Sequence, residues 1–141
     1  MPIHVPDAPR DPRGLVDTSV VIDLEQLDAR QLPVELAVSA ITMAELAAGP
    51  HATDDAVERA RRQDRLQRSE AAFDPLPFDG EAARAYGRIY AAEKARGRKA
   101  RGARALDLLI AATACAENLP IYTRNPEDFE GLRDLVQVVT V

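Results

Sequence analysis

The stretch Gly14-Leu15-Val16-Asp17-Thr18-Ser19 places a short apolar run directly before three polar residues. Such a run is typical of a buried strand whose carboxyl end meets polar side chains. The segment 20–27 follows with apolar residues at helical spacing, and Thr18 or Ser19 could cap that helix. The stretch therefore predicts the first strand–helix unit of an α/β fold.

The rest of the chain alternates in the same way between short apolar strands and longer helices. Further strands are expected at 34–41, 120–123 and 135–141, with a short strand or extended link at 74–78. Helices are expected at 43–48 (capped by Thr42), 54–72, 80–94 and 106–118, with a weak helix or loop at 95–103. This alternation predicts a three-layer α/β/α domain with a mainly parallel central sheet.

The composition fits a single domain of 141 residues, with 46% hydrophobic and 29% charged residues. Residues 1–13 hold four prolines and are expected to form an extended arm before a domain at 14–141. No apolar run approaches the roughly 20 residues of a membrane helix, and the N-terminus lacks the apolar core of a secretory signal. A single cysteine, Cys115, excludes a disulfide framework and a Cys-rich zinc site. We therefore expect a cytoplasmic protein with no membrane partner.

The charge is unevenly distributed along the chain. The net charge of −5 argues, taken alone, against a nucleic-acid partner. The segment 84–104, however, holds eight Arg and Lys residues against a single acid, Glu93. Such a ridge could contact a polyanion, or it could be a solvated helix face followed by a loop.

Functional groups of open α/β sheets gather beyond the carboxyl ends of the strands. On the expected fold, four carboxylates from separate segments reach this edge: Asp17, Glu45, Asp107 and Asp128. Asp17 ends the first strand, Glu45 lies early in the helix after the second strand, and Asp107 lies in the first turn of the helix 106–118. Thr123 and Asn125 accompany Asp128 after the strand 120–123.

Carboxylates that lie within about 4–6 Å of one another raise each other's pKa, and a divalent cation removes this penalty. All-oxygen sites suit Mg²⁺ or Mn²⁺, which can lower the pKa of a bound water and stabilise charge on a phosphoryl oxygen. The chain has only two histidines, His4 and His51. Water activated by a metal is therefore the simplest nucleophile that the sequence offers.

Each acid also has a purely structural interpretation. Asp17 could cap a helix, and Glu45 and Asp107 could be acids that the helix macrodipole favours in early turns. Asp128 could be a helix N-terminal acid after the turn at Asn125. All four would then have to meet at one edge of the sheet by coincidence.

Four blocks of the sequence together resemble a known family. They are the segments 14–23 (GLVDTSVVID), 39–46 (SAITMAEL), 104–114 (RALDLLIAATA) and 123–129 (TRNPEDF). Their order and spacing resemble the PIN domain and, more closely, the VapC toxins of bacterial type II toxin–antitoxin pairs. The resemblance covers residues 14–141, nearly the whole chain.

The resemblance implies a Mg²⁺- or Mn²⁺-dependent endoribonuclease that cleaves structured RNA such as tRNA or rRNA. It also implies a homodimer and a cognate VapB-like antitoxin that covers the active site. Carried over position by position, Asp17, Glu45, Asp107 and Asp128 become the catalytic, metal-binding acids. Ser19 and Thr123 would hydrogen-bond the acids or a metal-bound water, and Asn125 would do likewise or cap the following turn. Arg104 would meet a phosphate or an antitoxin acid, unless it pairs with a neighbouring acid of its own chain.

Two other functions remain open at this point. A non-catalytic module with the same fold could bind RNA or an antitoxin without cleaving anything. A phosphatase that uses an Asp nucleophile would need a second Asp two residues on, and position 19 is Ser.

Overall fold

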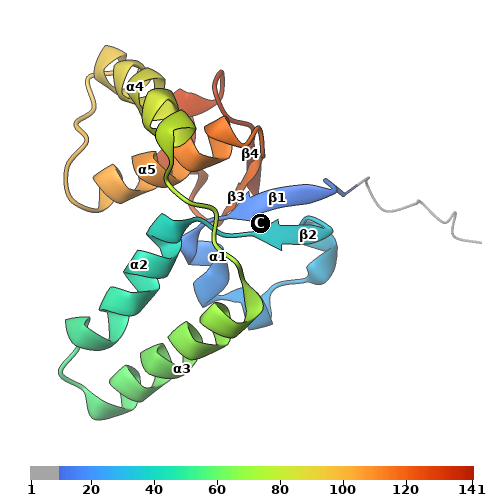
Figure 1. The fold of residues 1–141 in the computed structure, drawn as a ribbon, viewed down its shortest axis with the longest axis vertical. Coiled ribbons are helices and arrows are strands. Elements are labelled where there is room, and N and C mark those ends of the chain that lie inside the picture. Colours follow the sequence, from blue (N-terminus) through green and yellow to red (C-terminus); the bar gives the residue numbers. More distant parts are fainter. Residues whose placement is uncertain (1–9) are drawn as a thin grey trace, which may run out of the picture.

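A computed structural model describes residues 10–141 and contains one central sheet (Figure 1). Its four strands are β1 (Arg13–Val16), β2 (Glu35–Ala37), β3 (Ile121–Thr123) and β4 (Val138–Thr140). They lie in the order β2-β1-β3-β4, and each neighbouring pair is parallel. The carboxyl ends of all four strands therefore meet at one edge of the sheet.

Five α-helices connect and cover the strands. They are α1 (Thr18–Ile22), α2 (Ala40–Ala48), α3 (Ala56–Ala72), α4 (Gly80–Ala95) and α5 (Ala103–Ala116). Short 3₁₀ helices are η1 (Leu24–Gln26), η2 (Ala29–Gln31), η3 (Gly49–Ala52) and η4 (Pro126–Leu132). None of the helices within residues 10–141 has both the length and the apolar composition to cross a bilayer.

The sheet separates two hydrophobic cores, because successive side chains of a strand point to opposite faces. Leu15 of β1 and Ile121 of β3 pack with α4, α5 and η4. Val16 and Tyr122, one residue further along, pack with α1, α2 and residues of α3. Figure 1 shows α4 and α5 above the sheet and α2 and α3 below it. The predicted three-layer α/β/α architecture with a parallel sheet is confirmed.

Position 14, the first residue of the stretch 14–19, requires glycine because the Tyr122 ring of the neighbouring strand β3 lies directly against it. A Cβ atom at this position would lie 2.7 Å from the Tyr122 ring of β3. The Tyr122 hydroxyl, in turn, donates to Asp11 at 2.5 Å. A side chain on residue 14 would displace the Tyr122 ring and disturb its bond to Asp11.

Helix boundaries differ from the sequence-based expectation where a side chain caps earlier than supposed. Ser39, rather than Thr42, caps α2 and accepts a hydrogen bond from the Thr42 amide at 3.0 Å. The helix therefore begins at Ala40, and the expected strand 34–41 shortens to Glu35–Ala37. Asp17 itself, rather than Thr18 or Ser19, caps α1.

Two further helices also differ from expectation, whereas the segment 74–78 is an extended link as expected. The helix expected at 20–27 stops at Ile22 and continues as the 3₁₀ turn η1. The helix expected at 106–118 begins three residues earlier, at Ala103, so the segment 95–103 is mostly a loop. The link 74–78 contributes a single parallel bridge, between Ser39 and Leu76.

The expected arm, residues 1–13, lies mostly outside the described residues. Its last part packs on the domain. The Arg10 guanidinium donates to the carbonyls of Leu32 and Pro33, at 3.0 and 3.1 Å, and β1 begins at Arg13. The sheet thus starts one residue before the expected domain boundary.

Candidate active site

Asp17 follows the last residue of β1 and lies at the centre of the carboxyl edge. Its amide donates to the Tyr122 carbonyl of β3, which continues the sheet pairing and fixes the backbone. The Ser19 and Thr123 hydroxyls donate to its two carboxylate oxygens, at 2.5 and 2.6 Å. The Val20 amide donates to the same side chain as a helix cap. Asp17 therefore has one fixed orientation.

Asp17 is buried, with 4% of its surface exposed. Burial raises the pKa of its carboxyl group, and the negative charge of Asp128 raises it further. The hydrogen bonds from Ser19, Thr123 and Val20 oppose this shift, because they stabilise the ionised form. A buried carboxylate under this repulsion is a strong candidate for binding a cation.

Glu45 reaches the same edge from α2. The Thr18 hydroxyl of α1 donates to Glu45 at 2.7 Å and lies 3.1 Å from the Thr42 hydroxyl. Burial raises the pKa of Glu45, and Asp17 raises it further, while the bond from Thr18 lowers it. The contact between α1 and α2 thus brings the second acid towards the first.

Asp107 projects from α5, in the second turn rather than the expected first turn, because α5 begins at Ala103. Burial raises its pKa to about 7, and the charges of Asp128, Glu45 and Asp17 contribute in that order. The positive charge of Arg104 offsets only part of this shift. The four acids named from the sequence are therefore electrostatically coupled at one edge of the sheet, which we call the acidic edge.

Asp128 lies in η4, directly after β3, and its amide donates to the Asn125 carbonyl. The turn is held by Thr123, whose hydroxyl accepts from the Asn125 amide at 3.0 Å while it donates to Asp17. Asn125 thus contributes through its backbone, and its side chain makes no capping bond to η4. Ser19 acts in the same manner as Thr123, accepting from the Arg124 amide at 3.2 Å.

Arg104 pairs with an acid of its own chain. Its Nε donates to Glu93 Oε2 at 2.8 Å, and its Nη2 lies 2.7 Å from the same oxygen. Glu93, on α4, is 1% exposed, whereas Arg104 is 20% exposed. The ion pair fixes the guanidinium one helical turn before Asp107, where its positive charge acts on the Asp107 carboxyl group.

The donor set of this edge fits a hydrated divalent cation. All the charged donors are carboxylate oxygens, which Mg²⁺ and Mn²⁺ prefer. Within residues 10–141, no three acidic, histidine or cysteine side chains are arranged to hold an ion unaided. Mg²⁺ commonly takes only one or two carboxylates directly and keeps several waters, so a cage of three protein ligands is not needed.

Two contributors were not identified as site residues from the sequence. Thr18 was considered only as a helix cap, yet its hydroxyl binds Glu45. The sequence shows Glu93 only as the single acid of the basic segment 84–104, yet the structure buries it and pairs it with Arg104. A lone acid at a helical position among apolar residues was the signal that could have drawn attention to Glu93.

Comparisons with known proteins match this chain over most of its length. Residues 14–134 match the family model of the PIN domain. Ribonuclease VapC5 of Mycobacterium tuberculosis is 38% identical over 122 residues, which cover 84% of this chain and 87% of that protein. Ribonuclease VapC1 of Methanocaldococcus jannaschii is 32% identical over 126 residues, covering 85% of this chain and 81% of that protein.

Among solved structures, the chain is similar to VapBC-5, a member of the VapBC family of toxin–antitoxin systems from Mycobacterium tuberculosis. The TM-score is 0.78 at 35% sequence identity, and the likeness covers 92% of this chain and 98% of that one. The family match and both relatives agree with the family resemblance that the sequence indicates. The chain therefore belongs to the PIN-domain family, within its VapC group.

Proposed function

We propose that this chain is a divalent-metal-dependent endoribonuclease and the toxin of a type II toxin–antitoxin pair. The observation that carries the proposal is the convergence of four carboxylates at one sheet edge, where burial and then the charges of Asp128, Glu45 and Asp17 raise the pKa of Asp107 to about 7. A bound cation would offset both the burial of these carboxylates and the repulsion among them. Relatives named as ribonucleases VapC5 and VapC1 supply the reaction class.

Asp17 and Asp107 would hold the cation most directly, with Glu45 and Asp128 as further ligands or as acceptors for its waters. Bound Mg²⁺ or Mn²⁺ would lower the pKa of a water and stabilise charge on the phosphoryl oxygens. The reaction is an in-line attack of water on the phosphorus, which breaks a P–O bond of the RNA backbone.

The side chains around the acids have separable tasks in this reaction. Ser19 and Thr123 orient both oxygens of Asp17, and Thr18 orients Glu45. Arg104, fixed by Glu93, offers positive charge to a phosphate one helical turn from Asp107. The backbone of Asn125 holds Thr123 in place. These residues would position the substrate and the acids without forming a covalent intermediate.

The proposed partners follow from the same assignment. VapBC-5 is a member of a toxin–antitoxin family, so we assign this chain a VapB-like antitoxin that covers the acidic edge. We also assign it a homodimeric state, a structured RNA substrate such as tRNA or rRNA, and action in the cytoplasm. The remaining candidate, a non-catalytic module that binds RNA or the antitoxin, is distinguished by the experiment below.

The test compares RNA cleavage by the parent chain, Asp107→Asn and the control Asp134→Asn, an exposed acid of the segment after η4. RNA ends are sequenced after expression in cells, and purified RNA is incubated with protein in Mg²⁺, in Mn²⁺ and in EDTA. We expect new RNA ends with the parent and the control, and none with Asp107→Asn or in EDTA. Cleavage by a folded Asp107→Asn chain, or growth arrest without cleavage, would overturn the proposal.

A further inference from the structure

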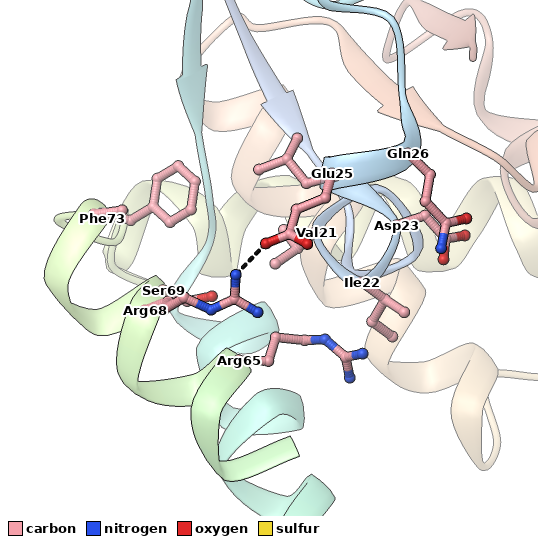
Figure 2. A pocket seen from close by; sticks show the side chains of 11 residues that line it. Val21, Ile22, Asp23, Glu25, Gln26, Arg65, Arg68, Ser69 and Phe73 are labelled. Atoms are coloured by element: carbon pink, nitrogen blue, oxygen red, sulfur yellow. Dashed lines mark hydrogen bonds and ion pairs between the residues drawn. The ribbon is translucent and has the colours of Figure 1, made fainter. Parts of the chain in front are cut away.

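Two hollows open side by side between α1 and α3, next to the acidic edge. The first, of about 320 Å³, is lined by Thr18 and Glu45 and by residues of α3. The second, of about 280 Å³, lies between η1 and the second half of α3 and is drawn in Figure 2. Ile22 and Arg65 line both hollows. Because the two hollows share these lining residues, we treat them together as the α1–α3 groove, which leads away from Glu45.

The arginines that line this groove differ in their partners. Arg62 donates to Glu58 at 3.0 Å and to the Gly49 carbonyl at 2.9 Å. Arg68 is paired with Glu25 and Asp64. Arg65, by contrast, makes no hydrogen bond or ion pair with any side chain or carbonyl of residues 10–141.

The position of Arg65 suits an anionic ligand. Its side chain is half-buried, and Figure 2 shows its guanidinium extended across the hollow towards Ile22. Partial burial removes water from the guanidinium, and none of the carboxylates that line the groove forms an ion pair with Arg65 to compensate. A planar guanidinium with free N–H groups matches the oxygens of a phosphate.

We propose that Arg65 binds a backbone phosphate of the RNA strand that flanks the phosphodiester being cut. This inference rests on the proposed function, since a strand with one phosphate at the acids must continue along the surface. The α1–α3 groove begins at Glu45, so it offers a direct path for that continuation. Ile22, 44% exposed on the border of both hollows, gives a ribose or base an apolar contact.

RNA fits this groove better than an acidic polypeptide. Its walls carry Asp23, Glu25, Glu45 and Glu58, so an anionic chain gains little from general charge attraction. An RNA strand is held at the acidic edge by the reaction itself, which brings its next phosphate to Arg65. A carboxylate peptide has no such second attachment. The acidic polypeptide is therefore the alternative outcome of the test.

The test measures RNA binding by the full chain carrying Asp107→Asn, which leaves the RNA intact. The probe is a fluorescein-labelled single-stranded RNA of about 20 nucleotides, followed by anisotropy between about 50 and 200 mM NaCl with Mg²⁺ present. Arg65→Gln removes the charge and Arg65→Lys keeps it. Arg61→Gln is the matched control, because Arg61 lies one turn earlier on α3, is well exposed and lines neither hollow.

We expect Arg65→Gln to weaken RNA binding about fivefold and to reduce the slope of log Kd against log salt by about 0.7, the loss of one phosphate contact. Arg65→Lys should keep most of the slope, and Arg61→Gln should stay within about twofold of the parent. Equal effects of Arg65→Gln and Arg61→Gln would overturn the inference. So would the absence of RNA binding at the lowest salt.

A parallel titration with poly-L-glutamate separates the two ligand classes. If Arg65→Gln weakens binding of poly-L-glutamate and leaves RNA binding unchanged, the groove takes an acidic polypeptide and the inference fails. Cleavage by the chain with an intact Asp107 is scored separately. Absence of cleavage rejects the proposed nuclease, whereas cleavage together with an unaffected Arg65→Gln rejects only the phosphate site.

Discussion

At the scale of single residues, Asp107 shows how the fold can hold a charge that it does not neutralise. Burial and three neighbouring acids raise its pKa to about 7, and Arg104 offsets part of the shift. Ser19 and Thr123 stabilise the ionised form of Asp17, but the structure provides no hydrogen-bond donor from residues 10–141 to the Asp107 carboxylate. Ionisation of Asp107 therefore lowers the free energy of unfolding of the metal-free protein.

This cost predicts how stability depends on pH in EDTA. Between its unfolded pKa near 4 and its folded pKa of about 7, Asp107 is protonated in the folded chain and ionised in the unfolded chain. The folded state binds more protons in this range, so the free energy of unfolding falls as pH rises from about 4 to about 7. We expect urea denaturation in EDTA to give a higher midpoint at pH 5.5 than at pH 7.5. The corresponding difference in the free energy of unfolding is about 1–2 kcal/mol after solvent screening.

Asp107→Asn is the control for this prediction. The amide cannot ionise, so the variant should be more stable than the parent at neutral pH and should lose most of the pH dependence. A parent chain whose stability is constant across this interval, or rises with pH, would contradict the raised pKa.

The buried pair of Glu93 and Arg104 leads to a second prediction at this scale. Glu93 is 1% exposed, and its Oε1 has no hydrogen-bond partner among the described residues. Removing Arg104 would leave this charge unpaired, which typically costs about 3–5 kcal/mol. We expect Arg104→Ala to lower the free energy of unfolding by this order, measured by urea denaturation.

The double variant tests whether pairing is the reason. Glu93→Leu removes the buried charge. In that background, Arg104→Ala should therefore lower the free energy of unfolding much less than it does in the parent chain. Additive costs of the two single changes would show that Arg104 stabilises the fold by packing alone.

At the scale of elements, α2 places Glu45 through its own N-terminal cap. The buried Ser39 side chain accepts from the Thr42 amide, and Thr42 contacts Thr18, which binds Glu45. We expect Ser39→Ala to lower the free energy of unfolding by about 1 kcal/mol, as loss of a cap does. Because the first turn of α2 also positions Glu45, RNA cleavage should fall more than the loss of folded protein explains.

The comparison variant is Thr53→Ala, which lies in the loop before α3 and binds the Asp55 amide away from the acids. Cleavage and circular-dichroism melts are measured for both variants at the same temperature. Equal cleavage per folded molecule in Ser39→Ala and the parent would show that the cap of α2 does not control Glu45.

The sequence predicted element types well where periodicity is strong and poorly where capping decides. The helix expected at 80–94 is observed at Gly80–Ala95, because its apolar residues recur at helical spacing. The helix around Asp107 begins at Ala103, directly after Gly102, which has a φ of +60° and no side chain that could cap the helix, so no capping residue marked its start. The early cap at Ser39 likewise moved α2 by three residues.

Strand order and side-chain pairing could not be predicted from the sequence. The order β2-β1-β3-β4 depends on which strands pair across long separations. The expected convergence of Asp17, Glu45, Asp107 and Asp128 needed only the parallel sense of the sheet, and their electrostatic coupling agrees with it. The bonds of Thr18 and Glu93 depend on how helices pack, and single-sequence periodicity carries no such information.

At the scale of the whole molecule, positive charge occupies two distinct regions. The basic segment 84–104 follows α4 and the loop to α5, on one side of the sheet, whereas Arg65 lies on α3, on the other (Figure 1). Two cations of the first region are already paired, Arg84 with Glu81 and Arg104 with Glu93. Whether this segment contacts a polyanion or is a solvated face therefore stays open to experiment.

Cation binding at the acidic edge should stabilise the whole molecule, since a ligand that binds only the folded state adds RT ln(1 + [L]/Kd) to its stability. At a hundred times Kd this is about 2.7 kcal/mol, which corresponds to a rise in Tm of several degrees for a domain of this size. We expect MgCl₂ or MnCl₂ to raise Tm at pH 7.5 and NaCl of equal ionic strength to have little effect. Asp17→Asn combined with Asp107→Asn should abolish the difference between the salts. A parent chain that responds equally to MgCl₂ and NaCl would show that these acids bind no cation, because screening alone acts without regard to ion identity.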